Sequence, residues 1–332
     1  MSPIPARSAP RAARLGLREL LRRLRREAAI QDRLFLVFLA YLALRVQLAP
    51  ESAGAESARA IAIGLFGLCL LALLLTRGGL LPAGGFRALV YRIGVVIPIV
   101  GAYLQMQIYL PALRPSLLDR QLYGIDRALL GETPALWMQP WHSFATVEWF
   151  SFFYLLFVHE IALVILATLA LDRGRRAVEL VFGAALILVV GCVSYTLVPG
   201  AGPHATLVFE APIQGGYWWA QVELMVETVG AQLDIFPSLH TALPVYFAIH
   251  AFAHRARHPY RWSWPILAFF ALNMVVSTMF LRWHWAIDVI MGLLLALLAR
   301  VLARLVSRSE LFRGVGRDDR QPVWEPLHPW RP

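Results

Sequence analysis

The chain has 332 residues, 58% of them hydrophobic, and its mean hydropathy is +0.59. This composition excludes an ordinary soluble protein and predicts an all-α, polytopic membrane helical bundle. The formal net charge of +10 rests on 31 basic residues, all of them arginine, which lie mostly in short segments between apolar runs. Since a nucleic-acid-binding protein would gather them on one soluble face, we expect no nucleic-acid partner.

Residues 1–32 form a basic segment before the first apolar run. They are rich in proline, alanine and arginine, and the first ten are expected to be disordered. Five arginines fall on one helical face and four leucines on the other, which suits a cytoplasmic helix lying on an anionic membrane surface. The arginines are Arg11, Arg14, Arg18, Arg22 and Arg25, and the leucines are Leu17, Leu20, Leu21 and Leu24. A solvated basic tail is the alternative.

Eight apolar runs follow, most of them close to the ~20 residues that cross a hydrocarbon core. They cover residues 33–49, 58–76, 88–110, 146–171, 177–198, 238–253, 264–281 and 285–305. We therefore expect about eight transmembrane helices, two peripheral ones in residues 33–87 and six in a functional domain of residues 88–306. The last segment, residues 307–332, is polar and proline-rich and is expected to be a disordered cytoplasmic tail.

The arginines also predict the orientation of the bundle. Arginine-bearing segments occupy both ends of the chain and alternate turns, whereas no arginine lies between Pro199 and Pro237. We expect the protein to lie in the cell (plasma) membrane. The positive-inside rule then places both termini on the cytoplasmic side of this membrane and residues 199–237 on its extracytoplasmic face.

The first long loop expected on that face covers residues 111–145. It carries Trp137 and Trp141, and tryptophans favour the membrane interface. Arg120 and Arg127 lie in the same loop. They would contact either a substrate phosphate or ordinary lipid headgroups.

The second long loop, residues 199–236, leads into the main motif region. Gly200 and Gly202, with two prolines, allow a tight path whose backbone N–H groups either cradle an anion or form a plain turn. The loop is also acidic, which would not attract a dianion but would offer hydrogen-bond acceptors to a polyol headgroup. The acidic residues are Glu210, Glu223, Glu227 and Asp234.

Two motifs flank the sixth and seventh apolar runs. The first is Pro237-Ser238-Leu239-His240, and the second is Arg282-Trp283-His284-Trp285-Ala286-Ile287-Asp288. Since one run enters the membrane and the next returns, His240 and His284 should reach the same face.

The second motif brings a histidine and a carboxylate together. His284 and Asp288 are four residues apart, hence on one helical face. An Asp inside an apolar span costs about 2.5–3.5 kcal/mol, so it usually has a partner and a role. A carboxylate bonded to one imidazole nitrogen fixes the tautomer and makes the other nitrogen a better base or nucleophile. Ser238 alone suits a helix N-cap, but with His240 and Arg282 the pattern predicts a catalytic site rather than a structural pair.

The two motifs resemble the second and third signatures of the type 2 phosphatidic acid phosphatase superfamily, the third in the form used by its inositol phosphorylceramide synthase-like branch. The segment from Tyr195 to His204 resembles that branch's stretch before the second motif, and residues 126–134 resemble its upstream loop. The first signature, a lysine followed by Arg-Pro, is absent. His204 stands where many relatives have arginine, and Arg282 takes the place of the third signature's usual cation.

The resemblance implies a six-helix phosphatase-like core and a membrane phosphotransferase whose partners are membrane lipids. It implies that His284 attacks phosphorus and forms a phosphohistidine, that Asp288 orients His284, and that His240 protonates the leaving oxygen and then deprotonates the incoming hydroxyl. Phosphate oxygens would be held by Ser238, Arg282, His204 and Gly202. The substrate loop would include Tyr195, Arg120, Arg127 and Asp234. Such a site requires no metal ion or cofactor.

The number of fixed positive charges at the motifs distinguishes between the functions that remain open. A phosphomonoester carries close to two negative charges and calls for several fixed cations, whereas Arg282 is the one evident cation at the motifs. We therefore predict transfer of a phospho-headgroup from a phosphatidylinositol-like phosphodiester to a lipid or sugar alcohol. The alternatives are a lipid phosphate phosphatase, which uses water, and, more remotely, a proton-coupled transporter, for which repeated halves are missing.

Overall fold

The computed structural model describes residues 16–327 except 53, 114–115, 172–173, 230–231 and 315–317. The disorder expected for the first ten residues therefore lies outside the described part. The N-terminal helices are α1 (Leu17–Glu27), α2 (Ile30–Gln47), α3 (Ala55–Thr76), α4 (Gly85–Leu104) and α5 (Met106–Leu113). A middle group comprises α6 (Asp119–Leu130), α7 (Pro134–Trp137), the 3₁₀ helix η1 (Gln139–Trp141), α8 (Phe144–Leu155) and α9 (Phe157–Leu171). The rest are α10 (Arg175–Tyr195), α11 (Pro203–Thr206), α12 (Tyr217–Val229), α13 (Leu239–Ala253), α14 (Tyr260–Phe280) and α15 (Ala286–Ser309).

The prediction of an all-α polytopic bundle is confirmed, although fewer helices qualify as spans than the eight expected. Six helical segments in the described chain are long and apolar enough to cross a membrane: α3, α4, the α8–α9 pair over Phe144–Leu169, α10, α14 and α15. Helix α13 has only 15 residues, about 22 Å at the usual rise. Helix α2 is continuous, but its sequence contains the charged residues Asp32, Arg33 and Arg45. Both lie in the bundle nonetheless.

The short helix α13 lies at the centre of the functional half of the molecule. It packs against α10, α14 and α15, and its Tyr246 and Phe247 are fully buried. At its N-terminal end the packing is close, because a Cβ added at Gly292 of α15 would lie 2.6 Å from the carbonyl oxygen of Ser238. A small residue at that point lets two helices approach closely, which brings the two motifs together.

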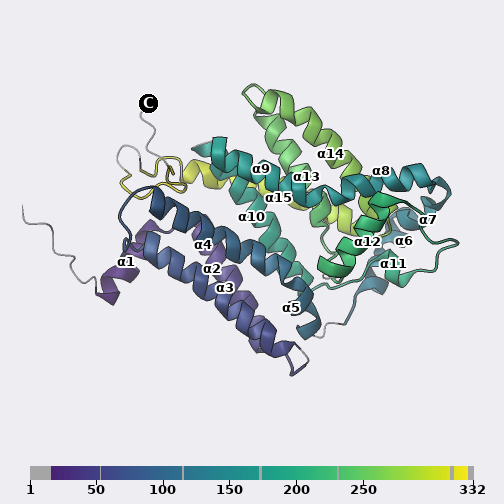
Figure 1. Cartoon of the computed structure of the whole chain (residues 1–332), viewed down its shortest axis with the longest axis horizontal. Coiled ribbons are helices and arrows are strands. Elements are labelled where there is room, and N and C mark those ends of the chain that lie inside the picture. The colour runs from purple at the N-terminus through teal and green to yellow at the C-terminus, as the bar shows by residue number, and fades with distance from the viewer. Residues whose placement is uncertain are drawn as a thin grey trace, which may run out of the picture.

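The remaining helices form two groups around this centre (Figure 1). Helices α2 to α5 form one block, in which α3 packs against both α2 and α4. The short helices α6, α7, α11 and α12 gather at the end of the bundle where α13 and α15 begin (Figure 1). Contacts of α6 with α15 and of α12 with α8 hold this cap in place.

The C-terminal segment differs from the disordered tail that we expected after residue 306. Helix α15 continues to Ser309, and residues 318–327 pack against the N-terminal block. The buried Arg77 donates to the carbonyls of Pro322 (3.0 Å) and Val323 (2.9 Å), and Glu325 pairs with Arg87 at 2.8 Å. A buried guanidinium needs acceptors, and this segment supplies two of them, in addition to the carboxylate of Asp32 at 3.0 Å.

Candidate active site

The first motif begins helix α13. Ser238 is the N-cap, since its hydroxyl accepts the backbone N–H of Thr241 at 3.2 Å. Its own backbone N–H donates to the carbonyl oxygen of Asp288 at 3.0 Å. The first turn of α13 is thus bonded to the first turn of α15, with His240 close to the junction.

The second motif begins in a tight turn at the end of α14. The carbonyl oxygen of Thr278 accepts the N–H groups of both Trp283 (3.0 Å) and His284 (3.1 Å). Arg282 within the turn has a φ of 66°, a left-handed conformation that is unusual for a residue other than glycine. Such backbone conformations cluster at functional sites, where surrounding contacts maintain them.

His284 and Asp288 form the pair that their spacing predicts. Asp288 is fully buried and is the third residue of α15; its Oδ2 accepts the N–H of Trp285 at 3.0 Å and lies 3.4 Å from Nδ1 of His284. His284 is only 3% exposed. The carboxylate therefore fixes the start of α15 and orients the imidazole at once.

A carboxylate from α6 completes the start of α15. Asp126 is fully buried and accepts the N–H groups of Ala286 (2.8 Å) and Ile287 (2.9 Å), and also the hydroxyl of Thr133 (2.8 Å). These backbone donors have no partner within their own helix, and a negative charge at a helix N-terminus is favourable. Asp126 thereby holds the helix that begins two residues after His284.

A second α6 carboxylate holds the loop before the first motif. Asp119 accepts the N–H groups of Ala201 (2.9 Å) and Gly202 (2.8 Å), together with Nε1 of Trp285 (3.0 Å). Gly202 has a φ of 90°, and a Cβ there would lie 2.3 Å from the carbonyl oxygen of Trp283. The residue must therefore be glycine, and its N–H, which we expected to bind phosphate, is bonded to the carboxylate of Asp119.

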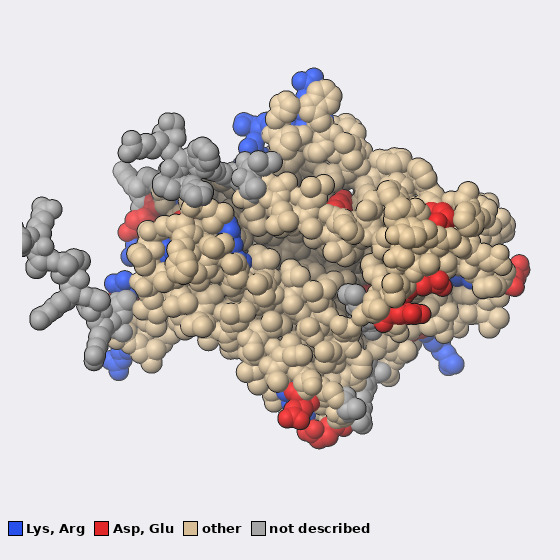
Figure 2. Space-filling model, viewed as in Figure 1, with Lys and Arg blue, Asp and Glu red and all other residues tan. Residues whose placement is uncertain are grey.

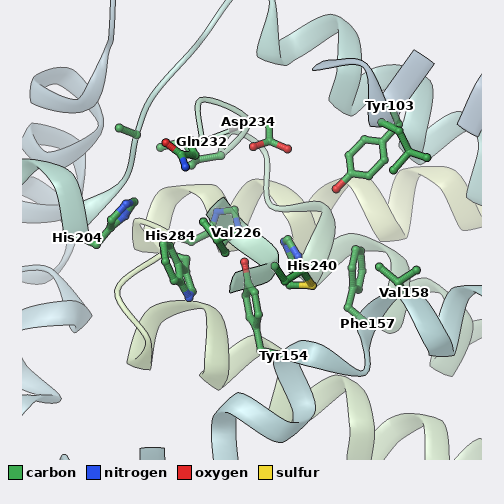
Figure 3. A pocket seen from close by; sticks show the side chains of 15 residues that line it. Tyr103, Tyr154, Phe157, Val158, His204, Val226, Gln232, Asp234, His240 and His284 are labelled. Carbon is green, nitrogen blue, oxygen red and sulfur yellow. The ribbon is translucent and has the colours of Figure 1, made fainter. Parts of the chain in front are cut away.

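The histidines of the two motifs line one cavity of about 110 Å³. Figure 3 shows His204, His240, His284 and Asp234 around it, together with aromatic and aliphatic side chains. The ring centroids of His240 and His284 are 5.6 Å apart, and His240 stacks on Tyr154 at 4.6 Å. Four of the predicted site residues are thus brought together, with Asp288 directly behind His284.

The electrostatics of the cavity favour a neutral His284. Burial lowers the pKa of His284 to about 4, although the charge of Asp234 opposes this shift. Burial also raises the pKa of Asp234. An imidazole that is unprotonated near neutral pH has a free lone pair, so His284 can act as a nucleophile or base.

The predicted arginines are not at this cavity. The guanidinium of Arg282 donates to the carbonyl oxygen of Ala211 (3.0 Å), lies 3.3 Å from Nδ1 of His142 and covers the ring of Phe209 at 3.8 Å. Arg120 and Arg127 are exposed on α6. No arginine is among the described residues that line the cavity.

Two further predicted residues have structural roles. Ser238 caps α13, which was the simpler reading of its position. The hydroxyl of the buried Tyr195 donates to the carbonyl oxygen of Pro237 at 3.4 Å and so supports the segment that leads into α13. Neither side chain lines the cavity.

The sequence reasoning missed Asp119 and Asp126. It selected the arginines of the same helix because they could bind phosphate, although a signal for the carboxylates was present. The two aspartates are seven residues apart, which places them on one face of α6 two turns from each other. The helix is otherwise apolar on that face, where Leu122 is buried.

The bundle and its histidine–aspartate pair define an integral membrane protein with a site suited to phosphoryl chemistry. Comparison with protein families matches residues 120–302, more than half of the chain, to the PAP2 superfamily. The chain therefore belongs to the PAP2 superfamily, the type 2 phosphatidic acid phosphatases, which confirms the prediction of a phosphatase or phosphotransferase enzyme. No curated protein and no solved structure matches the chain. The match contains the whole of both motifs, and it favours an enzyme over a transporter.

Proposed function

We propose that the chain is a membrane phosphotransferase that acts on a lipid phosphodiester and transfers the phospho-headgroup to an alcohol. The observation that carries this proposal is the set of ionisable side chains at the cavity. Among the described lining residues these are three histidines, one aspartate and two tyrosines, without an arginine. The arginine of the second motif is bonded to Ala211 instead.

Charge matching explains why this set favours a phosphodiester. A phosphomonoester brings close to two negative charges into a partly dehydrated site, where each needs a fixed cation or several hydrogen bonds. A phosphodiester brings one. The negative charge of a bound phosphodiester would favour protonation of one neighbouring imidazole, so that the two charges match. Asp234 would repel a dianion more strongly than a monoanion.

The reaction would proceed in two displacements. The lone pair of His284 attacks phosphorus, the bond from phosphorus to the oxygen of the lipid alcohol breaks, and a protonated His240 gives its proton to that oxygen. The acceptor hydroxyl then attacks the phosphohistidine, its proton passes to His240, and the phosphorus–nitrogen bond breaks. Asp288, next to Nδ1 of His284, orients the ring and stabilises the positive charge that develops on it.

The walls of the cavity suit a lipid with a hydroxylated headgroup. Tyr154, Phe157 and Val158 provide apolar surface for the lipid part. Asp234 offers a hydrogen-bond acceptor to the hydroxyl groups of a polyol such as inositol. We therefore propose a phosphatidylinositol-like lipid as the donor. The face shown in Figure 2 is hollowed near its centre, and the surface around the hollow is mostly uncharged, as expected for a path open to lipid.

We further propose that both termini are cytoplasmic and that this cavity faces the extracytoplasmic side of a cell (plasma) membrane. The support is the absence of arginine from residues 199–237 and its abundance at both chain ends. Donor and acceptor would then come from the outer leaflet or from the space beyond it.

The test is a side-by-side assay of the purified protein in detergent. One sample receives phosphatidic acid, and released phosphate is measured. The other receives phosphatidylinositol with a lipid or sugar alcohol, and headgroup transfer is measured. Transfer that is faster than phosphate release supports the proposal, and His284→Ala should abolish it. Fast phosphate release without transfer to any alcohol would overturn the proposal and establish a lipid phosphate phosphatase.

A further inference from the structure

A second cavity, of about 600 Å³, lies at the opposite end of the same helices. It is bounded by the start of α10, the turn after α13 and the second half of α15. His254 is fourteen residues beyond His240, or about 21 Å along a helix, and Arg300 is sixteen beyond His284, or about 24 Å. The two cavities are therefore separate sites. The charged and polar residues that line the second one are Arg175, Arg176, Glu179, His254, Arg257, Arg300 and Arg304.

The charge of this cavity is strongly positive. It contains five arginines and one acidic residue among its described lining residues. The arginines and Glu179 together give the lining a net charge of +4. A concave surface with charges of one sign concentrates the electrostatic field and attracts ions of the opposite sign.

The single carboxylate is already fully engaged. Oε1 of Glu179 accepts from Nε of Arg175 (3.0 Å) and from the hydroxyl of Ser307 (3.0 Å), and Oε2 lies 2.9 Å from Nε2 of His254 and 3.7 Å from Arg300. Glu179 is only 1% exposed. It therefore fixes the positions of the surrounding cationic side chains and offsets the charge of only one of them.

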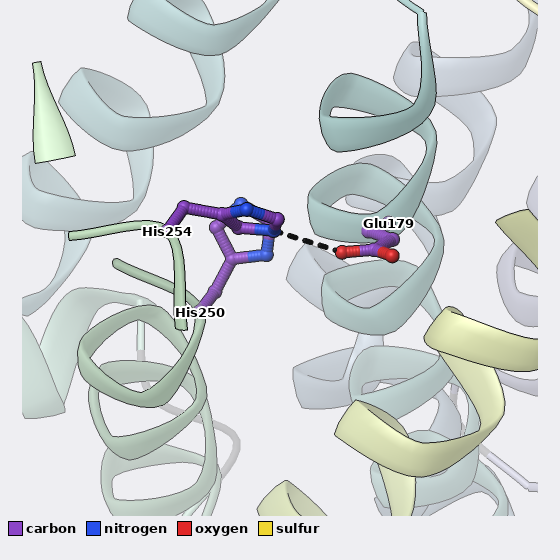
Figure 4. A group of neighbouring side chains, drawn as sticks. All are labelled: Glu179, His250 and His254. Carbon is purple, nitrogen blue, oxygen red and sulfur yellow. Dashed lines mark hydrogen bonds and ion pairs between the residues drawn. The ribbon is translucent and has the colours of Figure 1, made fainter. Parts of the chain in front are cut away.

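The same carboxylate also raises the possibility of a metal site. Figure 4 shows the imidazoles of His250 and His254 facing Glu179, and one ligand atom of each residue lies within 4.8 Å of the others. A divalent cation there would compete with Arg175, Ser307 and His254 for the carboxylate oxygens. It would also enter a cavity that already carries several positive charges, so an anion is the better ligand.

We infer that this cavity binds a phosphorylated anion through its arginines, either the phosphate of an anionic lipid headgroup or a soluble phosphate. Guanidinium groups match phosphate oxygens with paired hydrogen bonds. The cavity lies at the ends of two candidate spans, α10 and α15, which is the level of lipid headgroups in a bilayer. This inference does not depend on the reaction proposed for the first cavity.

The experiment compares two double variants of the full chain. Arg257→Gln with Arg304→Gln removes two charges from the cavity and leaves the contacts of Glu179 intact. Arg255→Gln with Arg261→Gln is the matched control, because both arginines are exposed nearby and do not line the cavity. Both are made in a His284→Ala background, so that turnover at the first cavity does not disturb the measurement.

Two arms separate the sources of the phosphate. In neutral detergent, inorganic phosphate and pyrophosphate are titrated and the thermal unfolding midpoint is followed. In nanodiscs, phosphatidylcholine alone is compared with phosphatidylcholine containing phosphatidic acid. We expect a saturable rise in the midpoint in at least one arm, with at least a tenfold weaker apparent affinity in the cavity variant and little change in the control.

The same measurements can overturn the inference. It fails if neither arm shows saturable stabilisation, or if the cavity variant and the control respond alike. It also fails if Zn²⁺ stabilises the cavity variant as well as the parent and His250→Ala abolishes that effect, because the site would then hold a metal. Equal unfolding midpoints of the two variants without ligand show that both are folded.

Discussion

Removing the carboxylate of Asp119 should separate positioning of the active site from its chemistry. Asp119 does not line the cavity, yet it accepts three hydrogen bonds: from Ala201 and Gly202, and from the indole of Trp285, the neighbour of His284. In Asp119→Ala these three donors lose their acceptor. A buried donor without a partner costs about 1–3 kcal/mol, so the free energy of unfolding should fall by about 3 kcal/mol or more.

The loss should be visible in both stability and rate. At about 2–4 °C per kcal/mol, the unfolding midpoint in detergent should fall by roughly 6 °C or more. Displacing a catalytic group by about 1 Å can cost about 10²-fold in rate, so we expect kcat to fall by about that factor while KM changes less. The assay is headgroup transfer measured alongside thermal unfolding of the same preparation.

Asp119→Asn should lie between the wild type and Asp119→Ala. Its amide oxygen can keep the two bonds that Oδ1 now accepts, from Gly202 and Trp285, whereas its NH₂ group would face the N–H of Ala201. Arg120→Ala, one residue further along the same helix, is the control, because Arg120 is exposed. If Asp119→Ala matches Arg120→Ala in both midpoint and kcat, the positioning role is refuted.

Three further predictions concern the pair, the pH dependence and the topology. Asp288→Asn should leave the fold intact, because the amide oxygen can still accept the N–H of Trp285, but it should lower kcat by about 10²–10⁴-fold; a loss below threefold would contradict the orienting role. Since His284 must be unprotonated to attack and burial lowers its pKa to about 4, activity should fall as the pH drops through about 4. In Asp234→Asn, which removes the charge that favours protonation, this acid limb should move to lower pH, and a limb near pH 6.5 in both proteins would contradict the assignment. A cysteine at Gln214 should be labelled by an impermeant thiol reagent in intact cells, because Cys69 and Cys192 are buried; labelling only after permeabilisation would reverse the topology.

The helical bundle and the meeting of two histidines follow from local patterns. Run lengths and the return of one apolar run after another are sufficient to place His240 and His284 at the same end of the bundle. The i, i+4 spacing is likewise sufficient to pair His284 with Asp288, because helix geometry fixes which side chains share a face. These features could therefore be predicted from the sequence.

The directions of the charged side chains could not be predicted in this way. Arg282 has a left-handed backbone conformation, and its guanidinium bonds to the carbonyl of Ala211. The guanidinium bond is a tertiary contact with a residue 71 positions earlier in the chain. From the sequence we predicted that Arg282 binds phosphate, because it is the one evident cation at the motifs. In the structure its guanidinium does not line the cavity and is bonded to Ala211.

Tertiary contacts also decide the roles of polar residues that a local pattern leaves open. Asp119 and Asp126 bind backbone N–H groups more than 80 residues away in the chain, and no local pattern names those partners. The C-terminal segment is similar: its composition is typical of disorder, but its carbonyls are bonded to the buried Arg77.

The most direct test of the central claim is to trap the covalent intermediate on His284. The purified enzyme is mixed with a phosphodiester lipid without acceptor, quenched in alkali, in which phosphohistidine is stable, digested and analysed by mass spectrometry. Our account predicts an adduct on the peptide that contains His284, with the mass of the phosphate together with its headgroup, and none in His284→Ala. Full turnover by His284→Ala, with no adduct on the wild-type peptide, would contradict the account.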